Sequence, residues 1–167
     1  TGAFIGGVHR MAARLDDRWE LAAGAFQSDP DASRAFGAAL GLAPERCYGD
    51  FAEMAAREAA RPDRIDAVSI VTPNHLHGPV ARAFLEAGVP AICDKPLASS
   101  LEDARALARR VRASGLPFVL THNYSGYPMV REAQALLAAG ELGDIRLVQV
   151  EYAQDWLTES VEATGNK

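Results

Sequence analysis

The fold is decided by residues 66–122, which read DAVSIVTPNHLHGPVARAFLEAGVPAICDKPLASSLEDARALARRVRASGLPFVLTH. Short apolar runs alternate in this stretch with longer amphipathic runs that end at a glycine. The apolar runs are 66–71, 89–93 and 117–120, and the amphipathic runs are 76–87 and 101–114. A short run that is apolar on both faces is typical of a buried parallel strand, and a glycine commonly ends a helix. The pattern predicts an α/β fold in which helices cover both faces of a parallel sheet.

The residues before this stretch extend the same scheme. Residues 19–26 and 46–48 are predicted as strands, and Asp29 and Asp50 are predicted to begin helices. At the start, Gly2-Ala3-Phe4-Ile5-Gly6-Gly7 forms a glycine-rich turn before a helix over 9–15. A dinucleotide-binding fold has a central strand immediately before such a turn. We therefore expect that this first strand is missing and that the sequence is part of a longer protein.

The pattern changes after residue 122. Residues 128–139 are predicted to form a helix, and residues 146–152 alternate between apolar and polar side chains. One-sided alternation is typical of an antiparallel sheet with a solvated face. We expect one domain over 1–122 and, over 123–167, the beginning of a second α+β domain with a mainly antiparallel sheet.

Composition excludes several classes of protein. Of the 167 residues, 49% are hydrophobic, and 17 basic against 22 acidic side chains give a net charge of −5. The hydrophobic fraction is enough to form a core. The negative net charge gives no electrostatic reason to bind nucleic acid or anionic lipid. No apolar run approaches the roughly 20 residues that span a bilayer. Cys47 and Cys93 lie in apolar surroundings, so we expect buried, reduced thiols in a cytoplasmic protein, and no metal site.

Lysine is scarce in this chain, which directs attention to Lys95. Only two of the 17 basic residues are lysines, Lys95 and the final Lys167. Ligands bind beyond the carboxyl ends of parallel strands, and Lys95 lies two residues after the end of the predicted strand 89–93. Pro96 disfavours helical geometry at Lys95, so the amine can project into a cleft and help move a proton when a carbinol is oxidised. A solvated lysine beside a helix cap is the alternative, and the residues alone leave both open.

Four motifs together resemble those of the Gfo/Idh/MocA oxidoreductases. They are Thr72-Pro73-Asn74-x-x-His77, Asp94-Lys95-Pro96-Leu97, Asn123-Tyr124 and Gly140-Glu141-Leu142-Gly143. The resemblance runs over essentially the whole chain. It implies a Rossmann-like, doubly wound domain that binds NAD or NADP. It also implies hydride transfer between the nicotinamide and a hydroxyl or ketone carbon of a sugar, cyclitol or related small molecule, by a homo-oligomer (a dimer or a tetramer).

The same resemblance assigns roles to single residues. Lys95 matches the catalytic lysine, and Asp94 replaces the usual glutamate before it, which shortens the carboxylate's reach toward the cofactor ribose. The cofactor-binding positions are Gly2, Phe4, Ile5, Gln27, Ser28, Thr72, Pro73, Asn74, His77, Asp94, Lys95 and Asn123. Capping of a helix is the alternative role for Asn74. The family usually supplies a further Asp and His from the second domain, and because no histidine follows His122, we expect these groups either to lie beyond Lys167 or to be lacking.

Two questions stay open at this stage. NAD-binding domains usually hold the adenosine ribose with an acid at the end of the second strand, and Gln27 stands at that position here. Ser28 or Arg34 could contact a 2′-phosphate instead, so NADP is an alternative. The second question is whether the protein catalyses a reaction at all. A non-catalytic dinucleotide-binding sensor or assembly protein would share most of these features.

Overall fold

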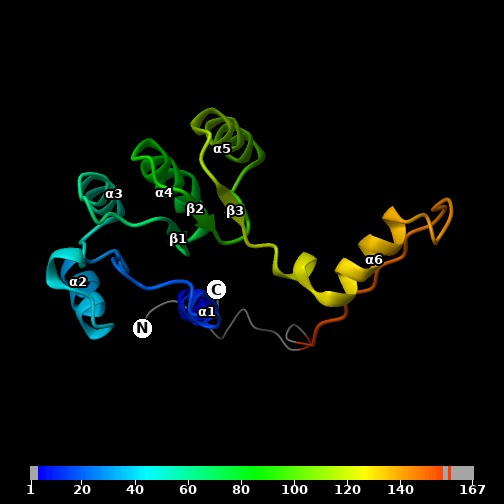
Figure 1. The fold of residues 1–167 in the computed structure, drawn as a ribbon, viewed down its shortest axis with the longest axis horizontal. Coiled ribbons are helices and arrows are strands. Elements are labelled where there is room, and N and C mark those ends of the chain that lie inside the picture. Colours follow the sequence, from blue (N-terminus) through cyan, green and yellow to red (C-terminus); the bar gives the residue numbers. More distant parts are fainter. Residues whose placement is uncertain (1–3, 156–157, 159–167) are drawn as a thin grey trace. The chain divides into compact units, whose positions relative to one another are not determined.

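The computed structural model describes residues 4–155 and 158, and the chain divides into two units (Figure 1). Unit 1 is Thr1–Asn123 and unit 2 is Tyr124–Lys167. The division falls one residue after the boundary that we predicted from the sequence. No helix within the described residues is both long enough and apolar enough to cross a membrane.

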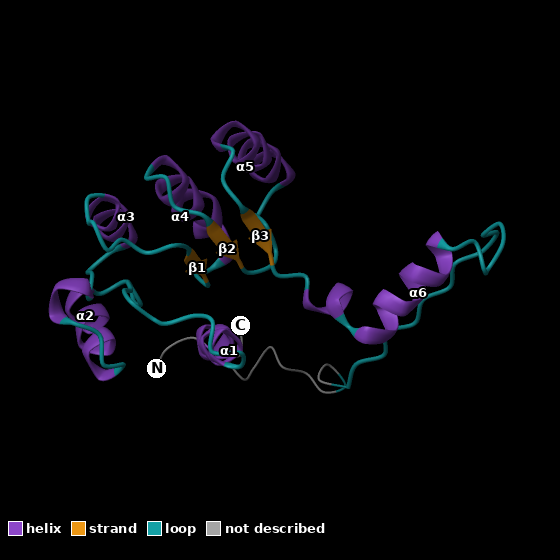
Figure 2. Cartoon of the chain, viewed as in Figure 1, coloured by secondary structure: helices purple, strands orange, loops and turns teal. Residues whose placement is uncertain are grey.

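Unit 1 is built on a parallel sheet. Among the described residues, β1 (Val68–Ile70), β2 (Ala91–Cys93) and β3 (Phe118–Leu120) form this sheet in the order β1-β2-β3. The register places Ala91 between Val68 and Phe118. These strands lie inside the three predicted apolar runs and are joined by helices (Figure 2). The predicted α/β fold with a parallel sheet is therefore confirmed.

Three helices pack in a row against one face of this sheet (Figure 1). They are α3 (Phe51–Ala59), α4 (Asn74–Glu86) and α5 (Leu101–Ser114). The central helix α4 contacts both neighbouring helices and the strands β1 and β2. Its Phe84 is 1% exposed, and the core continues through the inward-facing side chains of the strands. As predicted, glycines follow α4 and α5: Gly88 has a φ of +75° and Gly115 a φ of +66°. An L side chain would be strained at such a positive φ.

Two further helices complete unit 1, α1 (Phe4–Arg14) and α2 (Pro30–Ala39). The carboxylate of Asp29 accepts a hydrogen bond from the Ala32 N–H at 2.7 Å, which caps α2 as predicted. The carboxylate of Asp50 caps α3 in the same way. Helix α1 contacts the other face of the sheet through His9, whose Nδ1 lies 2.8 Å from the hydroxyl of Ser69 in β1.

Three local predictions in unit 1 are wrong. Residues 19–26 are not a strand, because only Gly24 finds a partner, in an isolated parallel bridge to Cys47. Residues 46–48 do not form a strand either, and the segment Pro44–Arg46 is a 3₁₀ turn. The glycine-rich turn was expected to run through Gly7, but α1 already begins at Phe4. Gly6 is buried there, and a Cβ would lie 3.5 Å from the Val71 side chain, which is an ordinary van der Waals contact, so the packing of α1 does not require glycine at this position.

Unit 2 contains the 3₁₀ turn η2 (Asn123–Gly126), which spans its boundary, and helix α6 (Pro128–Ala138). The predicted antiparallel strand over 146–152 does not form. Among the described residues, this segment has no strand partner, and Val148 and Val150 are exposed. An alternating pattern makes a strand only where a second strand supplies hydrogen-bond partners. Part of the second predicted domain, 156–157 and 159–167, lies outside the described residues.

Candidate active site

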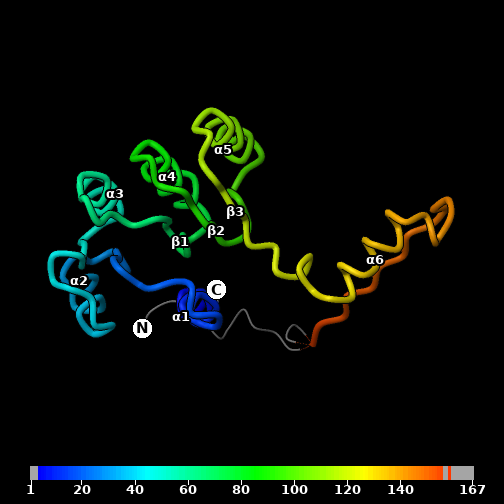
Figure 3. Tube along the Cα trace, in the orientation of Figure 1, coloured from blue at the N-terminus to red at the C-terminus, as the bar shows by residue number. Residues whose placement is uncertain are grey.

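The polar residues that follow β1, β2 and β3 lie at one edge of the sheet. Because the strands are parallel, all three loops leave the sheet at its carboxyl edge (Figure 3). Backbone bonds continue the ladder past the strand ends, from the Asp94 N–H to Ile70 O and from the Thr121 N–H to Cys93 O, both at 2.9 Å. These bonds hold the first residues of the loops in a defined place. Open parallel sheets bind their ligands at this edge.

Lys95 lies two residues after the end of β2, and its amine has no hydrogen-bond partner among the described residues. The side chain is exposed and makes no hydrogen bond or ion pair to any residue that the structure describes. The neighbouring carboxylate of Asp94 does not bind it: Oδ1 of Asp94 accepts a hydrogen bond from the Thr121 hydroxyl at 2.8 Å. The Lys95–Pro96 peptide bond is cis. The lysine is therefore an uncommitted amine at the ligand-binding edge.

Thr72, in the loop after β1, carries a polar atom that lacks a partner. Its hydroxyl Oγ1 is buried and has no hydrogen-bond partner among the described residues. A buried polar group without a partner costs about 1–3 kcal/mol, so most such groups in proteins are satisfied. A ligand bound at this edge would supply the missing partner. This unsatisfied hydroxyl matches the cofactor contact that the resemblance implies for Thr72.

His77 is held differently from what we expected. Its ring is 1% exposed and contacts two backbone carbonyls. Nε2 lies 2.9 Å from Thr72 O, and Nδ1 lies 2.7 Å from Pro96 O. Both ring nitrogens are thus occupied by protein groups. Pro73 is the N-cap residue of α4 and no side chain caps this helix, so the alternative role of Asn74 as a cap is wrong.

The remaining predicted cofactor residues are spread over unit 1. Gln27 donates from Nε2 to Ala32 O at 3.3 Å, and Ser28 is exposed. Phe4 and Ile5 form the start of α1, and the first N–H groups of a helix have no partner within the helix and can bind phosphate. Asn123 is exposed and begins η2, and Gly2 lies outside the described residues.

Two residues at this edge were missing from the predicted site. His9 lies on α1, and its Nε2 is 3.7 Å from Asp94 Oδ1, which also accepts the hydrogen bond from Thr121. Both contacts join residues far apart in the sequence. Thr121 directly follows the third predicted strand, as Asp94 follows the second, so the sequence places it at this edge. No signal in the sequence indicates which residue His9 contacts.

The thiol of Cys93, the last residue of β2, is predicted to be inert. The side chain is fully buried, and burial, with a smaller contribution from the charge of Asp94, raises the pKa of the thiol to about 11. The thiolate is the reactive species. In native protein at pH 8 we expect no reaction of Cys93 with a thiol reagent such as DTNB, and rapid reaction after unfolding in urea. A Cys47→Ala variant isolates the signal, and stoichiometric labelling of that folded variant would contradict the prediction.

Comparison with known proteins identifies the family. A family model described as an oxidoreductase family with an NAD-binding Rossmann fold, GFO_IDH_MocA, matches residues 1–122. The chain belongs to the Gfo/Idh/MocA oxidoreductase family. This match confirms the resemblance found in the sequence and the Rossmann fold of the first unit. It makes NAD the expected ligand at the carboxyl edge of the sheet.

Relatives within the Gfo/Idh/MocA family support this placement. An uncharacterized oxidoreductase, YfiI of Bacillus subtilis, is 38% identical over 149 residues, which are 89% of this chain and 38% of that protein. A crystal structure of an oxidoreductase from Sinorhizobium meliloti shares 57% identity with a TM-score of 0.90, over 95% of this chain and 44% of that one. An inositol dehydrogenase homolog from Azotobacter vinelandii, complexed with NADH and myo-inositol, shares 43% identity with a TM-score of 0.88, over 98% of this chain and 43% of that one. The chain thus spans less than half the length of these relatives.

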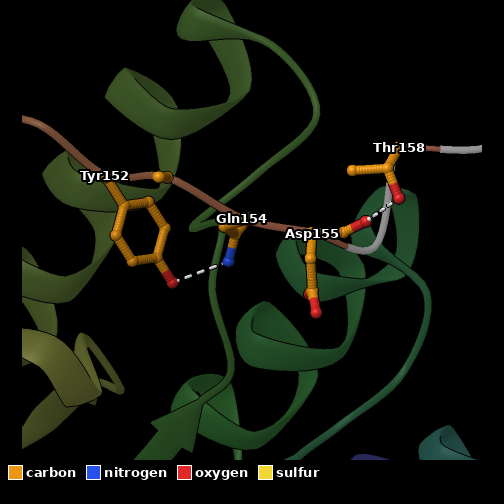
Figure 4. Close-up of a pocket in the computed structure, with 5 residues that line it drawn as sticks. Tyr152, Gln154, Asp155 and Thr158 are labelled. Atoms are coloured by element: carbon orange, nitrogen blue, oxygen red, sulfur yellow. Dashed lines mark hydrogen bonds between the residues drawn. The ribbon is translucent and has the colours of Figure 1, made fainter.

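A hollow in unit 2 does not belong to this edge. It is lined by Tyr152, Ala153, Gln154, Asp155 and Thr158 (Figure 4). Its polar groups bond to one another: Gln154 Nε2 donates to the Tyr152 hydroxyl, and the Thr158 hydroxyl donates to Asp155 O, both at 2.7 Å. None of the predicted cofactor-binding residues lines it.

Proposed function

We propose that the full-length protein is an NAD-dependent dehydrogenase or reductase that acts on a CH–OH group of a cyclitol, sugar or related small molecule. The observation that carries the proposal is the uncommitted amine of Lys95 at the carboxyl edge of the sheet. The buried, partnerless hydroxyl of Thr72 at the same edge supports a bound ligand there. The structural relative that holds NADH and myo-inositol supports the substrate class.

In this proposal the chain holds the cofactor with three kinds of group. The Thr72 hydroxyl binds it on the β1 side. Oδ1 of Asp94 is occupied by Thr121, so Oδ2 is the oxygen that remains for a ribose hydroxyl. The free N–H groups at the start of α1 bind the pyrophosphate, because the N-terminal end of a helix attracts negative charge.

Lys95 performs the proton transfer. When bound, NAD supplies the acceptor of a hydride. In the oxidation, the substrate hydroxyl would give its proton to the amine of Lys95 while the hydrogen of the carbinol carbon leaves as hydride to that acceptor. A ketone and a protonated lysine result, and the reverse reaction returns the proton to the developing alcohol. A positioned acid or base of this kind contributes about 100- to 10,000-fold to the rate.

The test is an assay of the full-length protein with NAD⁺ and a panel of cyclitols and sugars that begins with myo-inositol. We expect NADH absorbance to appear with at least one member of the panel. Tight binding of NADH without turnover on any alcohol, or on the corresponding ketones in the reverse direction, would contradict the proposal. It would favour the alternative of a non-catalytic dinucleotide-binding sensor or assembly protein. We also propose that the protein is cytoplasmic and that it forms a homo-oligomer. Light scattering on the full-length protein tests the oligomeric state.

NAD is expected to bind more tightly than NADP. Arg34, the cation nearest in sequence to Gln27 and Ser28, is already paired with Asp31 at 3.4 Å and with Glu53 at 3.5 Å. Asp29 follows Ser28 and adds negative charge. A 2′-phosphate at Ser28 would therefore meet the negative charge of Asp29, while the guanidinium of Arg34 is already paired. We expect a dissociation constant for NADP at least about tenfold above that for NAD, measured by calorimetry.

An Arg34→Ala variant controls this prediction. If the guanidinium only joins two carboxylates, the ratio of the two dissociation constants stays within about threefold of the original ratio. A different pair of results would show that Arg34 binds the 2′-phosphate: equal affinity for NAD and NADP in the unmodified protein, and weaker binding of NADP alone in the Arg34→Ala variant.

A further inference from the structure

The ring of His77 joins the two loops that border the proposed cofactor edge. His77 lies in the first turns of α4, which follows the loop after β1. Its Nε2 contacts Thr72 O in that loop, and its Nδ1 contacts Pro96 O in the loop after β2. The two carbonyls are far apart in the sequence, and the 1% exposed ring is the bridge between them.

The chemistry of these contacts makes the bridge specific. A backbone carbonyl only accepts hydrogen bonds, so each contact needs an N–H from the ring. A neutral imidazole satisfies one carbonyl and an imidazolium satisfies both. Other side chains of similar size lack donors in two opposite directions. Because the ring is buried, water does not readily replace a lost contact, and each unpaired carbonyl costs about 1–3 kcal/mol.

The bridge acts on the residue next to the proposed proton-transfer group. Lys95 is preceded by Asp94, whose backbone N–H bonds to Ile70 O and whose carboxylate bonds to Thr121. Lys95 is followed by Pro96, whose carbonyl is held by His77. The backbone is thus fixed on both sides of Lys95, while its own amine has no partner among the described residues. A proton-transfer group must be held close to its productive position, because a misplacement of about 1 Å can cost about 100-fold in rate.

We infer that His77 is a positioning residue for Lys95: its ring ties the loop after β2 to the loop after β1 and so fixes the backbone from which the lysine amine reaches the substrate. This inference rests on the proposed function of Lys95. It replaces the expected direct contact between His77 and the cofactor, because neither ring nitrogen is free to make one.

The experiment is a double-mutant cycle in the full-length protein with His77→Phe and Lys95→Met. We expect His77→Phe to lower kcat about 30-fold, while the dissociation constant for NADH stays within about threefold. In the Lys95→Met background, the same His77→Phe change is expected to lower kcat by less than about threefold, because the group that it positions is already gone. His75→Phe is the matched control. His75 is an exposed histidine on the same turn, with no hydrogen bond to a described residue, and we expect wild-type rates.

A second variant covers the case in which phenylalanine prevents folding at this buried site. His77→Gln keeps an N–H donor that can reach one of the two carbonyls, so it should fold and lose about threefold to tenfold in kcat. Its effect should also disappear in the Lys95→Met background. Recovery of rate by glutamine relative to phenylalanine supports a hydrogen-bonding role.

The outcomes separate the two claims. If the effects of His77 and Lys95 substitutions multiply, His77 does not act through Lys95 and the inference is wrong, whereas the role of Lys95 stands. If His77 variants weaken NADH binding more than about tenfold at unchanged kcat, His77 is a cofactor residue and the inference is likewise wrong. If Lys95→Met alone keeps full activity, it is the proposed function of Lys95 that fails.

Discussion

Replacing Lys95 with methionine in the full-length protein is expected to lower kcat about 1,000-fold, with the dissociation constant for NADH unchanged within about threefold. Methionine keeps much of the length of the side chain but has neither a proton to give nor a lone pair basic enough to take one. Since the lysine amine bonds to no described residue, its loss should disturb neither the fold nor the cofactor site. Steady-state kinetics and fluorescence titration with NADH measure the two quantities.

Arg105→Met controls for the loss of a surface charge. Arg105 is an exposed cation on α5 that forms no hydrogen bond or ion pair with a described residue, and its substitution should leave kcat unchanged. A Lys95→Met protein that turns over at the wild-type rate would remove Lys95 from the reaction. An unchanged kcat with a raised dissociation constant for NADH would assign the lysine to cofactor binding alone.

The largest expected effect on stability comes from Glu58, which is fully buried on α3. Its carboxylate accepts hydrogen bonds from Arg46 at 2.5 and 3.2 Å, from the Tyr48 hydroxyl at 2.6 Å and from the Ile65 N–H at 3.3 Å. Arg46 and Tyr48 flank Cys47, which forms the bridge to Gly24. The cluster therefore anchors the segment that leads to Gln27.

Glu58→Ala is expected to lower the free energy of unfolding by about 3–5 kcal/mol, because it leaves a largely buried guanidinium with only the exposed carboxylate of Asp63 at 3.4 Å and removes the partner of the buried Tyr48 hydroxyl. Equilibrium unfolding in urea measures this. Glu86→Ala is the matched control: Glu86 pairs with Arg110, both side chains are about half exposed, and such pairs contribute about 0–1 kcal/mol. A Glu58→Ala protein no less stable than Glu86→Ala would show that the buried cluster contributes little to stability.

Several of the features predicted correctly from the sequence depend on contacts between near neighbours. Asp29 and Asp50 cap helices by bonding to N–H groups two or three residues ahead, so their type and position are sufficient signals. Gly88 and Gly115 end helices for an equally local reason. The predictions for residues 19–26 and 146–152 failed because a strand depends on a partner that is distant in sequence, and the pattern of one segment does not reveal it.

The candidate site shows the same division. Lys95 was predicted because it lies just after a strand, at the edge that the ends of parallel strands share, and Thr72 was predicted from the resemblance to the family. The contacts of His77 could not be predicted, because Pro96 lies 19 residues away and offers a backbone carbonyl, which every residue possesses. The burial that excludes the ring from solvent arises from packing of α4 against the sheet, which is a property of the assembled fold.

The most direct test of the proposed proton transfer by Lys95 is the structure of the full-length protein with NADH and a substrate or inhibitor bound. We expect Nζ of Lys95 to lie about 3 Å from the reacting oxygen, within hydrogen-bond reach for proton transfer. We also expect the cofactor to accept or donate a hydrogen bond at the Thr72 hydroxyl. A complex in which the lysine amine points into bulk water, and another acid or base contacts the reacting oxygen, would contradict the account.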